Sequence, residues 1–242
     1  MKISIVTITY QDGLLLARTR RSVLRQILPQ WLELEHVIVT SDEDFDETLV
    51  DGARIIRRSP CGCYDAMNTG LEACTGDVLG LLHGNDFYAD EMVLADVAAA
   101  FAEPEVGMVF GDVYFTRADG TGRSRYYSTT KFRPKLLENG FMPPHPSFFM
   151  RREVFEETGP YSLDYAIASD FEYMLRVFNR RPEYGYRRIG RPLVAMSPGG
   201  LASLWRNRLF FTNYEKYRAL KRITGSASFF KLLGRYYYHF FQ

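Results

Sequence analysis

The chain has 242 residues, 46% of them hydrophobic and 24% charged, so it can bury a sizeable core in one large domain with an appendage. Its three cysteines are too few and too close together for a disulfide framework, and no window approaches the run of about 20 apolar residues that a membrane-spanning helix needs. The formal net charge of +1 conceals an asymmetry: from residue 201 onward eight Lys and Arg residues face a single acid, Glu215, so the first 200 residues are acidic.

The first 86 residues alternate between predicted strands and helices, an order typical of a mostly parallel α/β sheet. Ligands of such sheets gather at the carboxyl ends of the strands, so the residues at those ends should meet in one crevice. Strands are expected over 3–10, 35–42, 53–59 and 78–86, and helices over 14–28 and 63–77. The residues at the four strand ends are Thr9, Tyr10, Ser41, Asp42, Arg58, Ser59, Asn85 and Asp86.

The second half of the chain mixes helices, strands and a Pro-rich loop. The segment 167–180 has the apolar spacing of an amphipathic helix that begins near Ser169 and Asp170. The other expected elements are a helix over 90–102, a strand over 107–115, an extended segment over 123–130, a loop, strand and helix over 141–159, and a strand with a glycine turn over 191–200. Residues 201–242 are expected to be helical.

Neither of the common glycine-rich phosphate loops occurs, and there is no G-x-S-x-G motif, which disfavours an ATPase, a nicotinamide enzyme and a serine hydrolase. Acids at strand ends and helix starts are the more informative feature. They are Asp42, Asp65, Asp86 and Asp170. Any one of them alone is more often a helix cap or a turn former. All four lie where an α/β sheet brings its loops together, and this favours a common site.

The stretch YDAMNTGLEACTGDVLGLLHGNDFY, residues 64–88, joins a helix containing Asn and Gly, a Gly-Asp turn, an apolar strand and an acid at its end. Residues 140–161 and 164–176 add a Pro-flanked histidine and the segment ASDFEYM. In this order the motifs resemble the inverting family-2 glycosyltransferases of bacterial polysaccharide biosynthesis. The resemblance implies a GT-A fold, a Rossmann-like and mostly parallel sheet flanked by helices. Residues 1–115 would form the nucleotide-sugar half, 116–200 the acceptor half, and 201–242 a helical, aromatic and basic extension.

The resemblance also implies roles for individual residues. The end of the first strand would hold the base and ribose, and the end of the second would contact uracil or ribose with the match shifted by one residue. The helix at 63–77 would face the nucleotide and diphosphate. His145, in a rigid Pro-flanked loop, is either a structural imidazole or a hydrogen-bond donor to the diphosphate or to an acceptor hydroxyl. The residues predicted to bind the nucleotide sugar are Thr7, Thr9, Tyr10, Ser41, Asp42, Asp65, Asn68, Asn85 and His145.

Asp86 aligns with the last acid of a D-x-D motif, the usual metal ligand, while His83 and Asn85 stand where two further acids would be. The implied cofactor is Mn²⁺ or Mg²⁺, which needs only one or two protein carboxylates when substrate phosphates complete its coordination. His83 as a second ligand would favour Mn²⁺. Asp170 aligns with the catalytic base, and Glu172 would point elsewhere, to the surface or behind the site.

The predicted function is therefore inverting transfer of a sugar from a nucleotide diphosphate sugar, expected to be a UDP-sugar, to a glycan or lipid-linked glycan in cell-surface polysaccharide biosynthesis. The chain begins directly with a strand and no signal peptide, so we expect a cytoplasmic protein, at most at the inner face of the membrane. The reduced HGND motif leaves open a catalytically impaired nucleotide-sugar-binding protein of the same fold. A sugar-phosphate nucleotidyltransferase is disfavoured because no glycine-rich loop accompanies the first strand.

The tail, 201–242, interleaves cations with aromatic residues. Two interpretations stay open: it lies on an anionic membrane surface, or it packs on the protein's own body or on a second subunit. No recognised nucleic-acid module accompanies it, so we expect no nucleic-acid partner. The glycine pair at 199–200 is either an ordinary turn or a loop that approaches the donor diphosphate.

Overall fold

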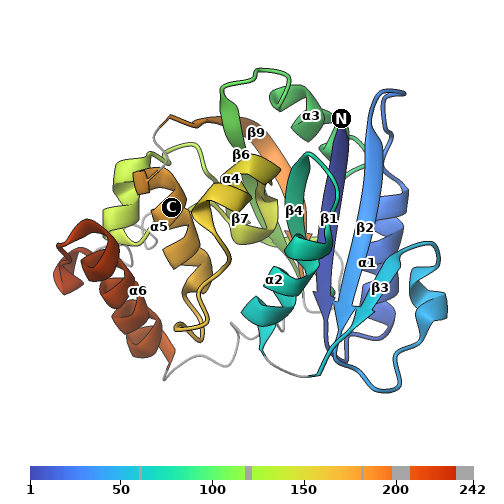
Figure 1. The fold of residues 1–242 in the computed structure, drawn as a ribbon, viewed down its shortest axis with the longest axis horizontal. Coiled ribbons are helices and arrows are strands. Elements are labelled where there is room, and N and C mark those ends of the chain that lie inside the picture. The colour runs from blue at the N-terminus through green and yellow to red at the C-terminus, as the bar shows by residue number, and fades with distance from the viewer. Residues whose placement is uncertain (60–61, 118–121, 181–182, 198–207, 233–242) are drawn as a thin grey trace.

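The computed structural model describes residues 1–59, 62–117, 122–180, 183–197 and 208–232 (Figure 1). Its described residues form one nine-stranded sheet with helices on both faces. The strands are β1 (Lys2–Thr9), β2 (Glu33–Thr40), β3 (Arg54–Arg57), β4 (Val78–His83), β5 (Phe87–Tyr88), β6 (Val106–Thr116), β7 (Arg123–Tyr127), β8 (Phe148–Arg151) and β9 (Gly185–Met196). The helices are α1 (Leu14–Leu24), α2 (Cys63–Ala73), α3 (Val93–Ala100), α4 (Arg152–Thr158), α5 (Ser169–Arg180) and α6 (Arg208–Thr224). The 3-10 turns are η1 (Glu47–Val50), η2 (Pro134–Asn139) and η3 (His145–Ser147).

The strand order is β3-β2-β1-β4-β8-β6-β9-β5, with β7 paired to β6. β3, β2, β1 and β4 are parallel neighbours. β8 is antiparallel to both β4 and β6, so β6 and its parallel partner β9 run in the same direction as β4. Only β5, β7 and β8 of this described sheet run the other way. The expected α/β fold with a mostly parallel sheet is confirmed, and the carboxyl ends of its parallel strands lie at one edge.

Side chains alternate between the two faces of the sheet, as the pleat requires. Leu79 and Leu81 of β4 join the core under α2, α4 and α5, whereas Val78 and Leu82 join the core on the other face with α3. Figure 1 shows α2, α4 and α5 on the near face of the sheet. Each fully buried leucine contributes about 1.5–3 kcal/mol, so both layers matter for stability.

Gly70 lets α2 lie against β1. A Cβ atom at this position would be 2.3 Å from Cγ1 of Val6, a distance that real atoms do not tolerate. Glycine therefore fixes how closely the helix that begins at the carboxyl edge of the sheet can approach its strands.

α6 packs on the body of the molecule. Ala219 and Leu220 are fully buried in the same core cluster as α2 and α5, and Leu232 follows them there. For the part of the tail that the structure describes, packing on the protein's own body is thus the observed arrangement. Residues 201–207 and 233–242 and the glycine pair at 199–200 lie outside the described residues. Among the residues described, no helix combines the length and the apolar character that a membrane span requires.

Several predicted boundaries differ from the structure, and two of the differences have identifiable reasons. The first helix ends at Leu24 rather than residue 28, because Gln26 leaves the helix to bridge the start of α3, donating to the carbonyl of Asp90 at 2.7 Å and accepting from the N–H of Leu94 at 2.8 Å. The last strand begins at Gly185 rather than residue 191. The polar residues 185–190 extend it because they form backbone hydrogen bonds with the long strand β6. Local composition signals neither long-range contact.

Candidate active site

The ends of β1 and β2 are tied together by carboxylates. The backbone N–H of Gln11, a residue in the left-handed region at φ 58°, donates to both oxygens of Asp42 at 3.0 and 2.8 Å. Asp12 accepts hydrogen bonds from the hydroxyl of Thr9 at 2.8 Å and from the N–H of Tyr10 at 3.3 Å. The loop after β1 is thereby folded around two acids.

Asp12 also touches the turn after β4. A Cβ atom on Gly84 would lie 2.3 Å from Oδ2 of Asp12 and 2.9 Å from Oγ1 of Thr9, so only glycine allows this approach. The N–H of Gly84 donates to the carbonyl of Ile8 at 3.0 Å, which aligns the two strand ends. Asp12 is not among the predicted site residues, although an acid directly after a strand in YQDG is a usable signal.

Asp86 is buried at the end of the same turn, with 3% of its surface exposed. Oδ1 accepts a hydrogen bond of 3.2 Å from the N–H of Ser197, just after β9. Burial raises the pKa of Asp86 to about 7, and the negative charge of Asp12 acts in the same direction. Burial also raises the pKa of Asp12, to which the charge of Asp42 adds. The carboxyl ends of β1, β2 and β4 therefore concentrate negative charge.

A divalent cation fits this charge. No group of three or more His, Cys, Asp or Glu side chains in the described part of the chain is arranged to hold a metal ion by itself. Asp86 nevertheless offers a buried carboxylate beside the charge of Asp12, and among the described residues it accepts one long hydrogen bond. Hard cations bound with substrate phosphates need no more than one or two such ligands.

A second group of polar side chains lies on the α5 side of the β4 end. The rings of His83 and His145 have their centroids 6.1 Å apart, and Nε2 of His145 hydrogen-bonds the Tyr161 hydroxyl at 3.0 Å. Burial lowers the pKa of each histidine to about 4. The neighbouring His145 ring lowers the pKa of His83 further, whereas the negative charge of Asp170 raises it. Both imidazoles are therefore neutral at pH 7.

Asp170 lies in the first turn of α5, as expected, and is half-buried. Burial raises its pKa, while the positive charge of Lys216, the hydrogen bond of 2.7 Å from the Phe171 N–H and the adjacent His83 ring oppose the rise. Lys216 is itself buried: its Nζ donates to the carbonyl of Gly140 at 3.0 Å and lies 4.6 Å from the centroid of the Phe171 ring.

Glu215, the neighbour of Lys216, holds the loop before α5. Its carboxylate accepts hydrogen bonds from the backbone N–H groups of Ala166, Ile167 and Ala168 at 2.8, 2.9 and 2.9 Å. Two adjacent residues of α6 thus position the start of α5 and place a cation near Asp170. Neither Glu215 nor Lys216 is among the predicted site residues, because nothing local in the sequence links α6 to a helix start more than forty residues earlier.

Three of the residues predicted to bind the nucleotide sugar lie at the carboxyl edge of the sheet, as expected from their positions at strand ends. Tyr10 is 59% exposed there, and Ser41 and Asn85 are half-buried in the loops that follow their strands. Asp65 lies in the first turn of α2 and forms an ion pair with Arg58, with Nε 2.7 Å from Oδ2. Arg58 therefore brings a cation beside the acid predicted to face the diphosphate.

Other predicted residues lie elsewhere. Thr7 is fully buried inside β1, with its hydroxyl 2.8 Å from Nε2 of His36, so it does not reach the crevice. Both polar atoms of the Asn68 amide bond the backbone of Tyr161, at 2.9 and 2.8 Å, which gives Asn68 a structural role. The side chain of His83, two residues after Leu81, points to the same face of the sheet, the face covered by α5. It therefore interacts with Asp170 and lies on the opposite side of the β4 end from Asp86.

Glu172 does point away from Asp170, but it is buried rather than at the surface. It forms an ion pair of 3.0 Å with Arg176 of the same helix, and Arg176 in turn donates to the carbonyl of Thr158 at 2.6 Å. This pair ties α5 to the end of α4.

Residues 4–159 match the model of glycosyl transferase family 2, and the chain belongs to this family. An uncharacterized glycosyltransferase of Mycobacterium tuberculosis is 30% identical over 181 residues, covering 72% of this chain and 68% of that protein. A PGL/p-HBAD biosynthesis glycosyltransferase of Mycobacterium bovis is 32% identical over 131 residues, covering 53% of this chain and 49% of that one. The match spans about half the length of this second relative.

Solved structures agree on the fold. The 1–349 region of Staphylococcus aureus TarS in complex with UDP-GlcNAc superposes with a TM-score of 0.69 at 14% identity, covering 92% of this chain and 65% of that one. A mannosyltransferase of Pyrobaculum calidifontis in complex with GDP-Man and Mn²⁺ gives a TM-score of 0.64 at 20% identity, covering 96% and 68%. At these identities the likeness establishes the GT-A fold.

Proposed function

We propose that the protein transfers a sugar, with inversion, from a UDP-sugar to a hydroxyl of a glycan or lipid-linked glycan in cell-surface polysaccharide biosynthesis. Membership of glycosyl transferase family 2 supports the reaction class. The UDP-GlcNAc complex of TarS and the biosynthetic name of the mycobacterial relative support the donor and the pathway class. We propose that this transfer takes place in the cytoplasm, at the inner face of the membrane.

The observation that carries the proposal is the arrangement of two unlike acids around the end of β4. Asp86 lies with Asp12 on the side of the β1 and β2 ends, and Asp170 lies with His83 and Lys216 on the side of α5. Burial raises the pKa of both acids, and the positive charge of Lys216 favours the ionised form of Asp170, which is the form that can accept a proton. The two sides can serve the leaving group and the attacking group separately.

On the donor side, Asp42 and Tyr10 would contact the uracil and ribose, and Arg58 the diphosphate. Asp86, with Asp12 beside it, would hold a divalent cation, which acts as a Lewis acid toward the departing diphosphate. The neutral imidazoles of His83 and His145 can donate hydrogen bonds to sugar or phosphate oxygens without adding charge.

On the acceptor side, Asp170 would remove the proton of the attacking hydroxyl from a distance of about 3 Å. The hydroxyl oxygen then bonds to the anomeric carbon as the bond to the diphosphate breaks. A single in-line displacement inverts the anomeric configuration and needs no covalent intermediate on the protein.

Asp170→Asn tests the proposal directly. With a panel of UDP-sugars and Mn²⁺, we expect transfer to fall by about 100-fold or more while UDP binding stays unchanged. Asp44→Asn, a change at an exposed loop position, is the matched control and should keep full activity. Asp86→Asn should remove the stimulation of transfer by Mn²⁺. Full activity of both site variants would refute the assignment.

A second candidate is a nucleotide-sugar-binding protein with impaired catalysis. It is favoured by the turn after β4, where Asp86 is the one carboxylate of HGND and has a pKa raised to about 7. This candidate predicts that the native chain binds UDP-sugars but neither transfers nor hydrolyses them with any divalent cation. Detectable turnover that depends on Asp170 would rule it out.

A further inference from the structure

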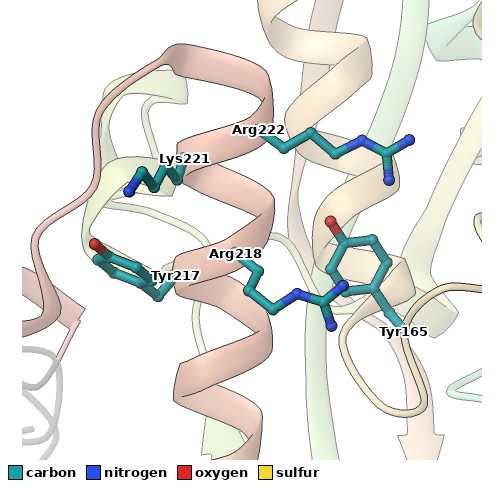
Figure 2. Close-up of a pocket in the computed structure, with 5 residues that line it drawn as sticks. All are labelled: Tyr165, Tyr217, Arg218, Lys221 and Arg222. Carbon is teal, nitrogen blue, oxygen red and sulfur yellow. The ribbon is translucent and has the colours of Figure 1, made fainter.

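A hollow of about 280 Å³ opens between α6 and the loop that precedes α5. It is lined by Tyr165, Tyr217, Arg218, Lys221 and Arg222. Figure 2 shows the four α6 side chains leaving neighbouring turns of the helix, with the guanidinium groups of Arg218 and Arg222 reaching toward the Tyr165 ring. None of these residues belongs to the donor or base sites described above.

Two of the three cations are held in place by the protein. The Arg222 guanidinium pairs with the Asp164 carboxylate at 2.9 Å, and the Arg218 guanidinium lies 5.3 Å from the centroid of the Tyr165 ring. Lys221 is exposed, and within the described part of the chain it has no recorded hydrogen bond or ion pair. Among the described residues Asp164 is the one acid paired with a cation of the hollow, so the hollow keeps a positive excess.

A phosphoryl group matches this lining. Guanidinium groups offer paired N–H donors that fit phosphate oxygens, and charge-assisted bonds of this kind are about twice as strong as neutral ones. Tyr217 and Lys221 extend from the opposite side of α6 to Arg218 and Arg222 in Figure 2, and the Tyr217 hydroxyl adds a further donor to the lining. A neutral sugar alone would leave the positive excess uncompensated.

The hollow is connected to the proposed base through one short loop. Tyr165 forms part of its lining, the next three residues are bonded by the Glu215 carboxylate from α6, and Asp170 follows in the first turn of α5. A group bound in the hollow is therefore in contact with the same loop that leads into Asp170.

We propose that this hollow binds a phosphoryl group of the acceptor, so that the acceptor is a glycan attached through a phosphate or diphosphate. The inference rests on the proposed function, because it names the chemistry of the acceptor for that reaction. Arg218 and Lys221 would recognise the acceptor's charge without taking part in the displacement.

Inorganic pyrophosphate is the first probe, titrated into the full chain with and without saturating UDP. With UDP present the diphosphate part of the donor site is filled, so further binding reports on another site. The double variant Arg218→Gln/Lys221→Gln should weaken this second binding by about tenfold or more, the equivalent of losing two partly exposed charge-assisted contacts. The matched control is the double variant Arg21→Gln/Arg25→Gln, which removes one exposed cation in α1 and one directly after it. This variant should bind pyrophosphate as the native chain does.

Transfer assays then link the hollow to the acceptor. Two synthetic acceptors with the same sugar are compared, an alkyl glycoside and an alkyl glycosyl diphosphate. We expect kcat/KM to favour the diphosphate by about tenfold or more in the native chain, and the double variant to lose that preference with its KM for the UDP-sugar unchanged. Equal use of both acceptors by the native chain would overturn the proposal.

A membrane headgroup carries the same phosphoryl chemistry as the proposed acceptor, and a vesicle-binding experiment distinguishes the two ligands. Sedimentation is measured with phosphatidylcholine vesicles with and without phosphatidylglycerol. If the double variant loses vesicle binding but keeps its pyrophosphate affinity and acceptor preference, the hollow is a membrane contact and the proposal is wrong. Failure of the proposed function is distinct, since the UDP-sugar would then fail to bind, or would bind without transfer of its sugar, whatever the hollow does.

Discussion

Glu215 of α6 accepts a hydrogen bond from the backbone N–H of Ala168, 2.9 Å away, in the residue that leads into α5 and its Asp170. The same carboxylate serves the N–H groups of the two preceding residues. The tail is thereby part of the structure that presents the proposed base.

Glu215→Ala should destabilise the protein strongly. The change leaves three N–H groups without their acceptor beneath α6, and we expect the free energy of unfolding to fall by about 3 kcal/mol in urea titrations. Glu156→Ala is the control: its side chain is 61% exposed and 4.0 Å from Arg152, so its loss should change stability by less than about 0.5 kcal/mol. Similar effects of both variants would refute the clamping role.

Lys216→Met should change the pH dependence of transfer. The positive charge of Lys216 opposes the rise in the pKa of Asp170 that burial causes, so without it that pKa rises further. A base works only when ionised, and the acidic limb of the activity profile should therefore move to higher pH. Lys216→Arg retains the charge and should restore the native limb. An unmoved limb in Lys216→Met would show that the two groups do not interact.

Gly84→Ala should displace Asp12, because the new Cβ would lie 2.3 Å from its Oδ2. We expect a loss of about 1–3 kcal/mol in the free energy of unfolding, as for other overpacked sites, together with weaker UDP binding in the presence of Mn²⁺. The double variant Gly84→Ala/Asp12→Ala removes the shorter of the two clashes and leaves the one at 2.9 Å from Oγ1 of Thr9, so it should recover part of the stability but not the binding. If stability is not recovered, the contact between these residues is not the cause.

His36 should make the protein sensitive to acid. Arg20 donates to its Nδ1 at 3.0 Å, which leaves Nε2–H to donate to the Thr7 hydroxyl at 2.8 Å, and burial lowers the pKa of the ring from 6.5 to about 3. The unfolded chain therefore binds a proton that the folded chain does not, so stability is lost as pH falls below 6.5.

Between pH 6.5 and about pH 5 this single group should cost about 2 kcal/mol. His36→Gln keeps a polar side chain and cannot titrate, so its unfolding free energy should fall less steeply over the same range, even if it starts lower. Parallel pH profiles of the two proteins would contradict the prediction.

Much of the fold follows from periodicity in the chain. Apolar alternation marks β1, β2 and β4, and helical spacing marks α5 with Asp170 at its start. The parallel order of these strands then brings Asp42 and Asp86 to one edge, as the sheet requires.

The rest depended on contacts that the sequence does not display. Thr7 and Asn68 were assigned to the nucleotide by resemblance, but a chain position does not determine which neighbour a hydroxyl or amide bonds. Here the Thr7 hydroxyl is hydrogen-bonded to His36, and the Asn68 amide is hydrogen-bonded to the backbone of Tyr161. Glu215 and Lys216 belong to the site because α6 packs against α5, a long-range consequence of burying residues such as Leu220.

The position of β8 has a consequence for how the protein is made. Phe149 of β8 pairs with Gly80 of β4 on one side and with Val109 of β6 on the other, so the central strand of the sheet comes from late in the chain. While a ribosome is still adding the segment that follows β6, the edge of β4 has no partner, and an unpaired apolar edge attracts other chains. A nascent chain cut short before Phe148 should therefore aggregate instead of completing its parallel strands, so the first half of the sheet depends on a strand from much later in the chain.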